Sequence, residues 1–134
     1  MLGEIEISMS RGVDFGFETT LSGRSHLGVI RRLKEHGYGV HVFYLWVPSV
    51  ELALARIRER VLLGGHDVPE AVVRRRFERS IANFLVHYRL LADRWMLFDN
   101  SAARPALVAS QKHAVLRVVD TKGYNELVLR YGAQ

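Results

Sequence analysis

Cysteine is absent from the 134 residues of this chain, which excludes disulfide bonds, thiolate catalysis and cysteine-ligated metal sites. No apolar run reaches the roughly 18 residues that a membrane-spanning helix needs. The first residues, Met1–Glu4, lack the basic start and apolar core of a signal peptide. The six histidines form no pair at helical ligand spacing beside a carboxylate. We therefore expect a cytoplasmic protein without a membrane partner and without a metal site.

The composition is that of an ordinary globular protein. Hydrophobic residues make up 49% and charged residues 25% of the chain, and the length fits one domain spanning residues 1–134. The formal charge of +5 favours anionic partners such as nucleotides, phosphosugars or nucleic acid.

Hydrophobic periodicity predicts an α/β fold with a mostly parallel sheet. The nearly continuous apolar run Val40–Val47 predicts a core strand that is covered on both faces. The remaining strands are expected at Phe15–Phe17, at Trp95–Asn100 and in a hairpin formed by 106–109 and 114–119 around Gln111–Lys112. Helices are expected over about 23–36 with Ser22 as N-cap, from Val50 with Ser49 as N-cap, from Pro69 to about Ala92 and near 122–131. Residues 1–13 fit helical and strand spacing alike, with a slight preference for helix.

A polar turn is expected where the short strand Phe15–Phe17 leads into the first of these helices. It carries Glu18, Thr20, Ser22 and Arg24. A carboxylate there can accept sugar hydroxyls, and hydroxyl and amide groups can hold phosphate oxygens. The alternative is a helix start that Ser22 caps, with no ligand.

A basic segment flanks the glycine pair Gly64–Gly65. Arginines on both sides of a flexible loop can close over a polyphosphate, although a solvated helix face explains them as well. The arginines concerned are Arg58, Arg60, Arg74, Arg75, Arg76 and Arg79. In the nearby loops, His66 and the pair Asp99–Asn100 could contact a ligand, but simple exposure and turn capping are the favoured interpretations.

Four segments, in this order, resemble the zeta-toxin-like P-loop kinase family. They are Phe-Glu-Thr-Thr-Leu-Ser-Gly-Arg at 17–24, Val-Phe-Tyr-Leu-Trp-Val-Pro-Ser at 42–49, Gly-Gly-His-Asp-Val-Pro at 64–69 with the triple Arg at 74–76, and Leu-Phe-Asp-Asn-Ser at 97–101. The resemblance implies a three-layer P-loop-kinase-like sandwich with a C-terminal antiparallel hairpin. It also implies ATP with Mg as cofactor and a sugar nucleotide such as UDP-N-acetylglucosamine as substrate.

The same resemblance assigns roles to individual residues. Glu18 and Thr20 match the family residues that hold the sugar substrate, and Arg24 follows in the same turn. Arg60 and one of the residues Arg74, Arg75 and Arg76 correspond to arginines of a lid, about 58–79, that hold ATP phosphates.

The chain departs from the family in lacking the sequence Gly-x-x-x-x-Gly-Lys-Ser/Thr, whose amides and Lys hold phosphates. The segment with the family's catalytic Asp is missing too, so the resemblance implies a kinase fragment that is inactive alone. In such folds the strand before the missing loop is central and lies between the strands expected at Phe15–Phe17 and Val40–Val47. Because unpaired buried backbone groups are costly, we expect the gap to close by direct pairing, by segment exchange in a homodimer, or through a missing N-terminal partner.

Two other functions compete with a kinase fragment. One is a non-catalytic nucleotide-binding or regulatory module that acts through a protein partner. The other is nucleic-acid binding through the helix around Arg74–Arg79, which the lack of an aromatic stacking platform disfavours.

Overall fold

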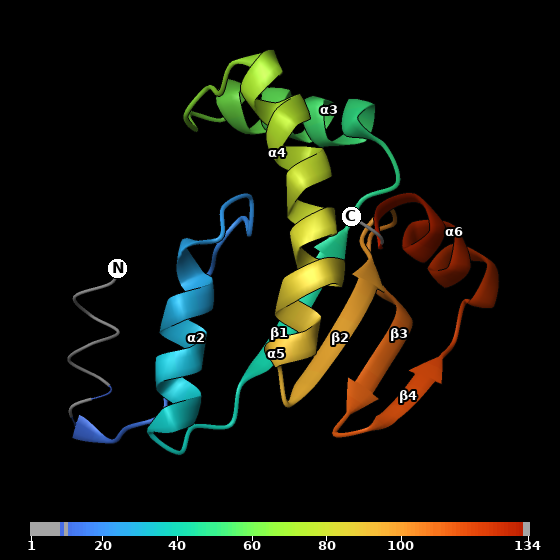
Figure 1. Ribbon diagram of the computed structural model, residues 1–134. Helices are drawn as coiled ribbons and strands as arrows, with labels where there is room; N and C mark the ends of the chain where they lie inside the picture. The colour runs from blue at the N-terminus through green and yellow to red at the C-terminus, as the bar shows by residue number, and fades with distance from the viewer. Residues whose placement is uncertain (1–8, 10, 133–134) are drawn as a thin grey trace.

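The computed structural model describes residues 9 and 11–132. Helices and a small sheet alternate along the chain and confirm the α/β class (Figure 1). The elements are α2 Ser25–Glu35, β1 His41–Trp46, α3 Val50–Leu62, α4 Glu70–Asn83, η1 Phe84–Tyr88, α5 Arg89–Leu91, β2 Arg94–Asp99, β3 Ala106–Lys112, β4 Val115–Val118 and α6 Thr121–Tyr131. Among the described residues, no helix combines the length and the apolar character that crossing a bilayer requires.

The sheet has four strands in the order β1-β2-β3-β4. The pair β1–β2 is parallel, and the pairs β2–β3 and β3–β4 are antiparallel, which confirms the C-terminal hairpin. The predicted turn of that hairpin was two residues early. The chain reverses after Lys112, where His113 adopts a positive φ of 56°.

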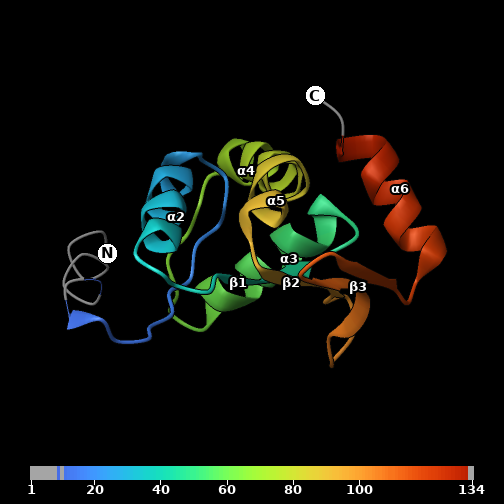
Figure 2. The same cartoon turned by 60° about the horizontal axis from the view of Figure 1, so that its bottom comes forward.

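One face of the sheet packs against helices and forms the core. Figure 2 shows α2, α4, α5 and α6 on the same side of the strands. On this face Trp95 and Leu97 are fully buried, and the ring of Phe84 meets Trp95 edge-on at 5.6 Å and stacks on Tyr44 at 4.8 Å. Residues of η1 therefore sit against the centre of the sheet.

The predicted long helix from Pro69 to about Ala92 exists as three joined segments, α4, η1 and α5. Its middle is a π-helical turn, a wider helix geometry that apolar spacing does not reveal. The element thus reaches from the α3 side of the molecule to the start of β2 (Figure 1).

Two predictions at the N-terminal end were wrong. Phe15–Phe17 forms no strand, since Phe15 packs edge-on against Tyr38 and Phe17 stacks on His26 instead of joining the sheet. Arg24, not Ser22, is the N-cap of α2, and it makes no side-chain cap hydrogen bond. Of the segment 1–13, Met9 and Arg11 are helical and Gly12–Val13 are not, while residues 1–8 and 10 lie outside the described part.

The prediction that β1 is covered on both faces was also wrong. Its side chains alternate between exposed and half-buried, and Phe43 and Leu45 are 63% and 56% exposed. The strand is at the edge of the described sheet, so direct pairing with the Phe15–Phe17 segment does not close the expected gap. One face and one edge of this apolar strand lack a partner among the described residues.

Candidate functional site

The polar turn at Thr20–Gly23 is fixed by side chains of the long central helix. Asn83 donates from Nδ2 to the carbonyl of Leu21 at 2.7 Å, and Tyr88 donates its hydroxyl to the carbonyl of Gly23 at 3.0 Å. Ser80 donates from Oγ to the carbonyl of Thr20. Three carbonyls of one turn are therefore satisfied from the α4 side, and the turn is held as a unit.

This anchoring extends into the sheet through Tyr44. The Tyr44 hydroxyl lies 2.7 Å from Ser80 Oγ. Because the single Ser80 proton goes to the Thr20 carbonyl, Tyr44 must be the donor of this contact. Burial raises the pKa of Tyr44 to about 12, against the smaller lowering effect of the Ser80 hydrogen bond, so Tyr44 stays protonated at neutral pH. The strand β1, the helix α4 and the turn thus form one hydrogen-bonded chain.

The other side of the turn faces solvent with its polar groups available. Glu18, Thr20 and Arg24 are exposed, and Thr20 Oγ1 lies 2.9 Å from Ser22 Oγ. Leu21 is buried and adopts a φ of 54°, which is unusual for a residue with a side chain. The buried Leu21 side chain therefore anchors the turn in the core, while the side chain of Thr20 is exposed. Glu18, Thr20 and Arg24 are all exposed, and the substrate-binding role that the resemblance implies for them stays a prediction.

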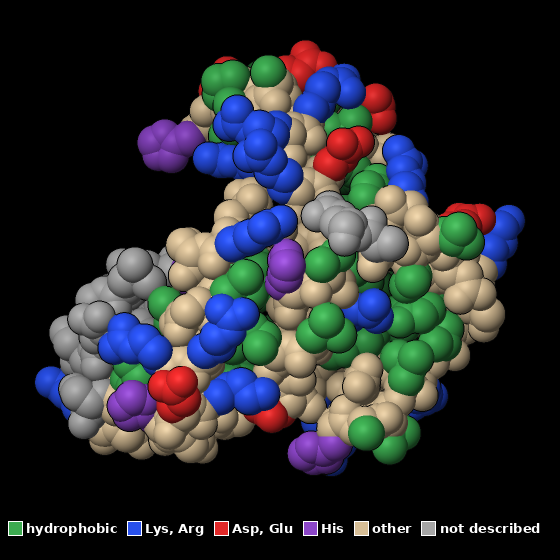
Figure 3. Space-filling view, in the orientation of Figure 1, with side chains coloured by type: hydrophobic (Ala, Val, Ile, Leu, Met, Phe, Trp, Pro, Cys, Tyr) green, Lys and Arg blue, Asp and Glu red, His purple; other side chains and the backbone are tan. Residues whose placement is uncertain are grey.

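A hollow of about 410 Å³ lies between the turn and α4. Its lining includes Arg24 from the turn and Arg79 from α4, together with Ser22, Ala82 and Asn83. The size falls in the range of small-molecule sites, and two guanidinium groups from different elements favour an anionic ligand. Figure 3 shows the notch between the lid and the part of the molecule that carries α2, with Lys and Arg side chains crowded on its lid side.

A second hollow of about 380 Å³ lies on the other flank of α4. Glu78, Arg79, Ala82, Arg130 and Tyr131 line it. Arg79 therefore borders both hollows.

The predicted lid is the hairpin formed by α3 and the first turns of α4. Gly64 in its connection has a φ of 96°. A Cβ on Gly65 would lie 2.8 Å from the carbonyl oxygen of Arg60, which the Gly65 amide already approaches to 2.7 Å. Both glycines are thus required by the turn geometry. Arg60, Arg75 and Arg76 are exposed on this hairpin.

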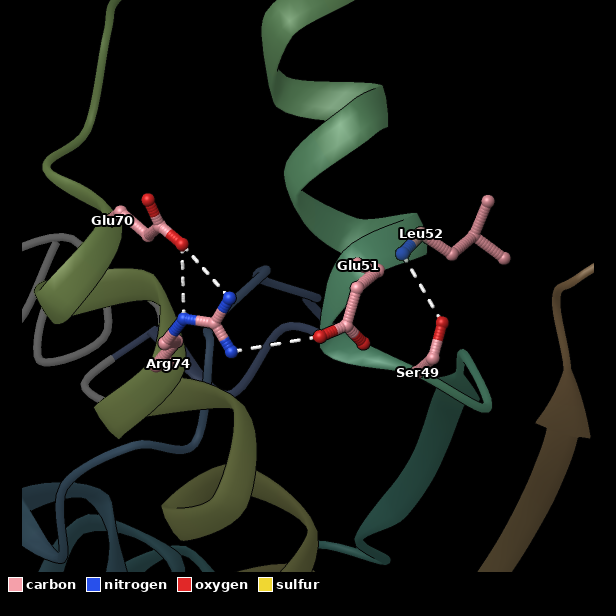
Figure 4. Close-up of polar contacts among 5 residues, drawn as sticks. All are labelled: Ser49, Glu51, Leu52, Glu70 and Arg74. Carbon is pink, nitrogen blue, oxygen red and sulfur yellow. Dashed lines mark hydrogen bonds and ion pairs between the residues drawn. The ribbon is translucent and has the colours of Figure 1, made fainter.

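Arg74 has a different role from its neighbours in the triple Arg. Its Nη2 and Nε donate to Glu70 Oε1 at 2.8 and 3.1 Å, and its Nη1 lies 3.6 Å from Glu51 Oε1 on α3 (Figure 4). The α3 helix begins beside this pair, where Ser49 Oγ accepts the Leu52 amide at 3.2 Å and confirms the predicted N-cap. Arg74 therefore connects the two lid helices, while Arg75 and Arg76 are exposed.

The base of the lid meets the loop after β2. Arg56 donates from Nη2 to the Ser101 carbonyl at 3.2 Å, and Asp99 Oδ1 accepts the Ser101 amide at 2.8 Å. Asp99 therefore caps its own turn, as the favoured interpretation predicted. His66 is exposed in the lid connection.

The described residues do not by themselves fit a complete ATP–Mg site. The sequence has no glycine-rich loop followed by Lys to hold the phosphates. Within residues 9 and 11–132, no group of three or more His, Asp or Glu side chains is placed to hold a metal ion. The lid arginines can meet phosphate oxygens, but the cradle for a phosphate donor is not among these residues.

Sequence reasoning did not select the residues that hold the turn, namely Ser80, Asn83 and Tyr88. Asn83 is a buried amide and needs a hydrogen-bond partner, but its burial follows from the packing of the helix and is not visible in the sequence. Arg79 was noted only as part of the basic segment, and its place beside Arg24 depends on the packing of α4 against the turn.

The chain is similar in sequence to a known protein family and to a bacterial protein. The sequence model of the family described as zeta toxin matches residues 5–104. An uncharacterized protein of Haemophilus influenzae is 37% identical over 76 residues, which cover 57% of this chain. The chain spans about half of that relative's length, 54%. No solved structure matches the chain.

Proposed function

Because this chain belongs to the zeta toxin family, which points to a kinase-like nucleotide-binding function, we propose that it is the acceptor-binding and lid portion of a nucleotide kinase. It binds a sugar nucleotide such as UDP-N-acetylglucosamine and transfers no phosphate by itself. The observation that carries this proposal is the rigidly anchored turn whose functional groups Glu18, Thr20 and Arg24 face outward beside a cationic hollow.

The turn supplies the groups that a sugar requires. The Glu18 carboxylate accepts hydrogen bonds from sugar hydroxyls, and Thr20 Oγ1 both donates and accepts. The hydrogen bonds to the carbonyls of Thr20, Leu21 and Gly23 hold the backbone that carries Thr20 in position before the ligand arrives, which lowers the entropy cost of binding.

The cationic groups supply contacts for the diphosphate. Arg24 and Arg79 line the hollow, and Arg60, Arg75 and Arg76 are carried by the lid hairpin. Guanidinium groups bind phosphate oxygens in pairs, and α4 carries the lid residues Arg75 and Arg76 as well as Arg79 of the hollow.

The chain is expected to be inactive alone because the donor side of the reaction lacks its phosphate loop and Lys. ATP with Mg is expected to bind only when a glycine-rich loop is supplied from outside these 134 residues. If such completion never occurs, the chain acts as a nucleotide-binding regulatory module, the alternative that shares the same turn.

Isothermal titration of the full chain with UDP-N-acetylglucosamine tests the proposal. Glu18→Ala should weaken binding by about ten- to a hundredfold, since a hydrogen bond to a charged group contributes about 1.5–3 kcal/mol. Glu35→Ala, at the exposed end of α2, is the matched control and should leave the affinity unchanged. Equal affinity of the wild type and Glu18→Ala would reject the assignment of the turn.

A further inference from the structure

One face of the sheet carries large exposed side chains. The helices α2, α4, α5 and α6 lie on the other side of the strands (Figure 2). Because side chains alternate along a strand, the residues of β1 to β4 that do not face these helices share one surface. We call this surface the open face; Phe43, Met96, Ser110 and Arg117 are its central residues, one on each strand.

Two phenylalanines give the open face flat aromatic surfaces. Phe43 of β1 is 63% exposed, and Phe98 of β2 is half-buried. The two residues lie on adjacent strands and two positions apart in register, which places their Cα atoms about 8 Å apart from the strand spacing and the rise per residue. Among the described residues, neither ring contacts another aromatic ring. The faces of both rings are therefore available for a ligand.

Three cations lie on the same face. Arg94 is directly opposite Lys112 in the sheet, and Arg117 is directly opposite Ser110. Arg94, Lys112 and Arg117, here called the cationic row, are exposed, and within the described part of the chain none of them forms an ion pair. Asp99, the one acidic residue within the four strands, alternates onto the covered side with Trp95 and Leu97. The charged residues that the strands place on the open face are therefore all cationic.

Aromatic rings beside cations restrict the kind of partner. A second copy in a symmetric face-to-face contact would place cations on both sides without a carboxylate from the strands to pair with them, which is unfavourable. Unpaired nucleotides offer both complements, because their bases are flat and their phosphates are anionic. Common RNA-binding modules use an open four-stranded sheet in this way and stack two or three bases on its aromatic side chains.

We propose that the open face binds single-stranded RNA. Bases stack on Phe43 and Phe98, and the cationic row contacts phosphates. Ser110 supplies a hydroxyl next to Arg117 that can pair with a ribose 2′-hydroxyl. The sequence offered no aromatic platform beside the basic helix around Arg74–Arg79, whereas the structure provides one on the sheet. This surface is separate from the turn Thr20–Gly23, since the turn contacts α4 on the covered side.

Fluorescence anisotropy of the full chain with a labelled oligouridylate of about 12 nucleotides tests the proposal. We expect saturable binding whose logarithm falls with the logarithm of the salt concentration at a slope of about −2, because three cations each contribute about −0.7 on a single strand. An RNA duplex of the same length should bind at least about tenfold more weakly, since its bases cannot reach the rings. An oligodeoxythymidylate should also bind more weakly, because it lacks the 2′-hydroxyl.

Two variants separate stacking from charge. Phe43→Ala should weaken binding by at least about fivefold and leave the salt slope unchanged. Arg94→Gln combined with Arg117→Gln should change the slope from about −2 to about −0.7. Leu129→Ala and Lys122→Gln, at exposed positions of α6, are the matched controls and should keep the affinity and slope of the wild type.

Absence of binding overturns the proposal, as does a duplex that binds as tightly as the single strand. Equal affinity for the oligodeoxythymidylate rejects RNA as the partner. A salt slope that responds to Arg75→Gln with Arg76→Gln, and not to the cationic-row variant, assigns the site to α4 instead. A dimer of the chain alone that Phe43→Ala dissociates in light scattering makes a second copy the occupant. The comparison of single strand with duplex uses the wild type, so it decides the question even if a variant folds poorly.

Discussion

The side-chain amide of Asn83 donates a hydrogen bond of 2.7 Å to the carbonyl of Leu21, across 62 residues of sequence. This contact ties the turn that presents Glu18 and Thr20 to the helix α4. The same helix carries Arg74, Arg75 and Arg76 of the lid at its other end. The position of the turn and the orientation of the lid are therefore set by one continuous element.

Asn83→Ala should lower the free energy of unfolding by about 1–3 kcal/mol, because the buried Leu21 carbonyl would lose its partner. It should also weaken binding of UDP-N-acetylglucosamine, since the turn would no longer be held in place. Urea unfolding and calorimetric titration measure the two effects. Asn125→Ala on the exposed side of α6 controls for loss of an amide. Unchanged affinity in a destabilised Asn83→Ala would show that the amide has a structural role only.

Gly65→Ala should distort the lid connection, because the new Cβ would lie 2.8 Å from the Arg60 carbonyl oxygen. We expect faster limited proteolysis between α3 and α4, with little change in the melting temperature of the core. Gly28→Ala is the contrasting substitution: it lies inside α2 with open space around it and should stabilise the chain by about 0.5–1 kcal/mol. Equal protease resistance of Gly65→Ala and the wild type would contradict this view of the connection.

Two arginines of α4, Arg74 and Arg79, should have different roles. Arg79→Gln should weaken sugar-nucleotide binding, because Arg79 lines the hollow beside the turn. Arg74→Gln should loosen the lid, which limited proteolysis detects, and should leave global stability nearly unchanged because its ion pairs are exposed. A larger loss of affinity in Arg74→Gln than in Arg79→Gln would contradict this assignment. It would mean that Arg74 gives up its ion pairs with Glu70 and Glu51 and contacts the ligand.

Asp93 should make the stability of the fold depend on acid pH. Its Oδ2 accepts the Val40 amide at 2.7 Å, and this hydrogen bond, with a smaller contribution from Lys34, lowers the pKa of the carboxyl below its ordinary value of 3.8. A lowered folded-state pKa gives stability that is present above pH 3.8 and is lost as the pH falls through the folded-state pKa.

Asp93→Asn should therefore remove this part of the acid dependence and lower stability at neutral pH only slightly, because the carboxyl is partly exposed and the amide oxygen can still accept the Val40 hydrogen bond. Urea unfolding at pH 7 and at successive values below about pH 4 measures both. Glu35→Gln, exposed at the end of α2, is the control. A parallel loss of stability in wild type and Asp93→Asn below pH 4 would assign the acid sensitivity to other carboxylates.

Much of the fold could be predicted because apolar spacing and capping residues are local signals. Val40–Val47, the Ser49-capped helix, Trp95–Asn100 and the C-terminal hairpin all follow from them. Phe15–Phe17 could not be placed this way, because a short aromatic segment packs equally well on a helix, and here Tyr38 and His26 receive the two rings. Strand pattern alone also cannot show that a face such as that of Phe43 and Leu45 lacks a cover.

Part of the candidate site could also be predicted, because some of its residues are close together in the sequence. Glu18, Thr20 and Arg24 are close in sequence, so their meeting required no knowledge of the fold. The anchors Ser80, Asn83 and Tyr88 meet the turn only through the packing of α4, a contact across about sixty residues. The brace formed by Arg74 likewise depends on how α3 lies beside α4.

The most direct measurement compares two ligands on one sample of the pure chain: calorimetric titration with UDP-N-acetylglucosamine, followed by addition of ATP–Mg and assay of phosphate transfer. The account predicts saturable binding of the sugar nucleotide that Glu18→Ala weakens, with no transfer of phosphate. Turnover of ATP by the chain alone, or sugar-nucleotide binding that is absent or indifferent to Glu18, would contradict it.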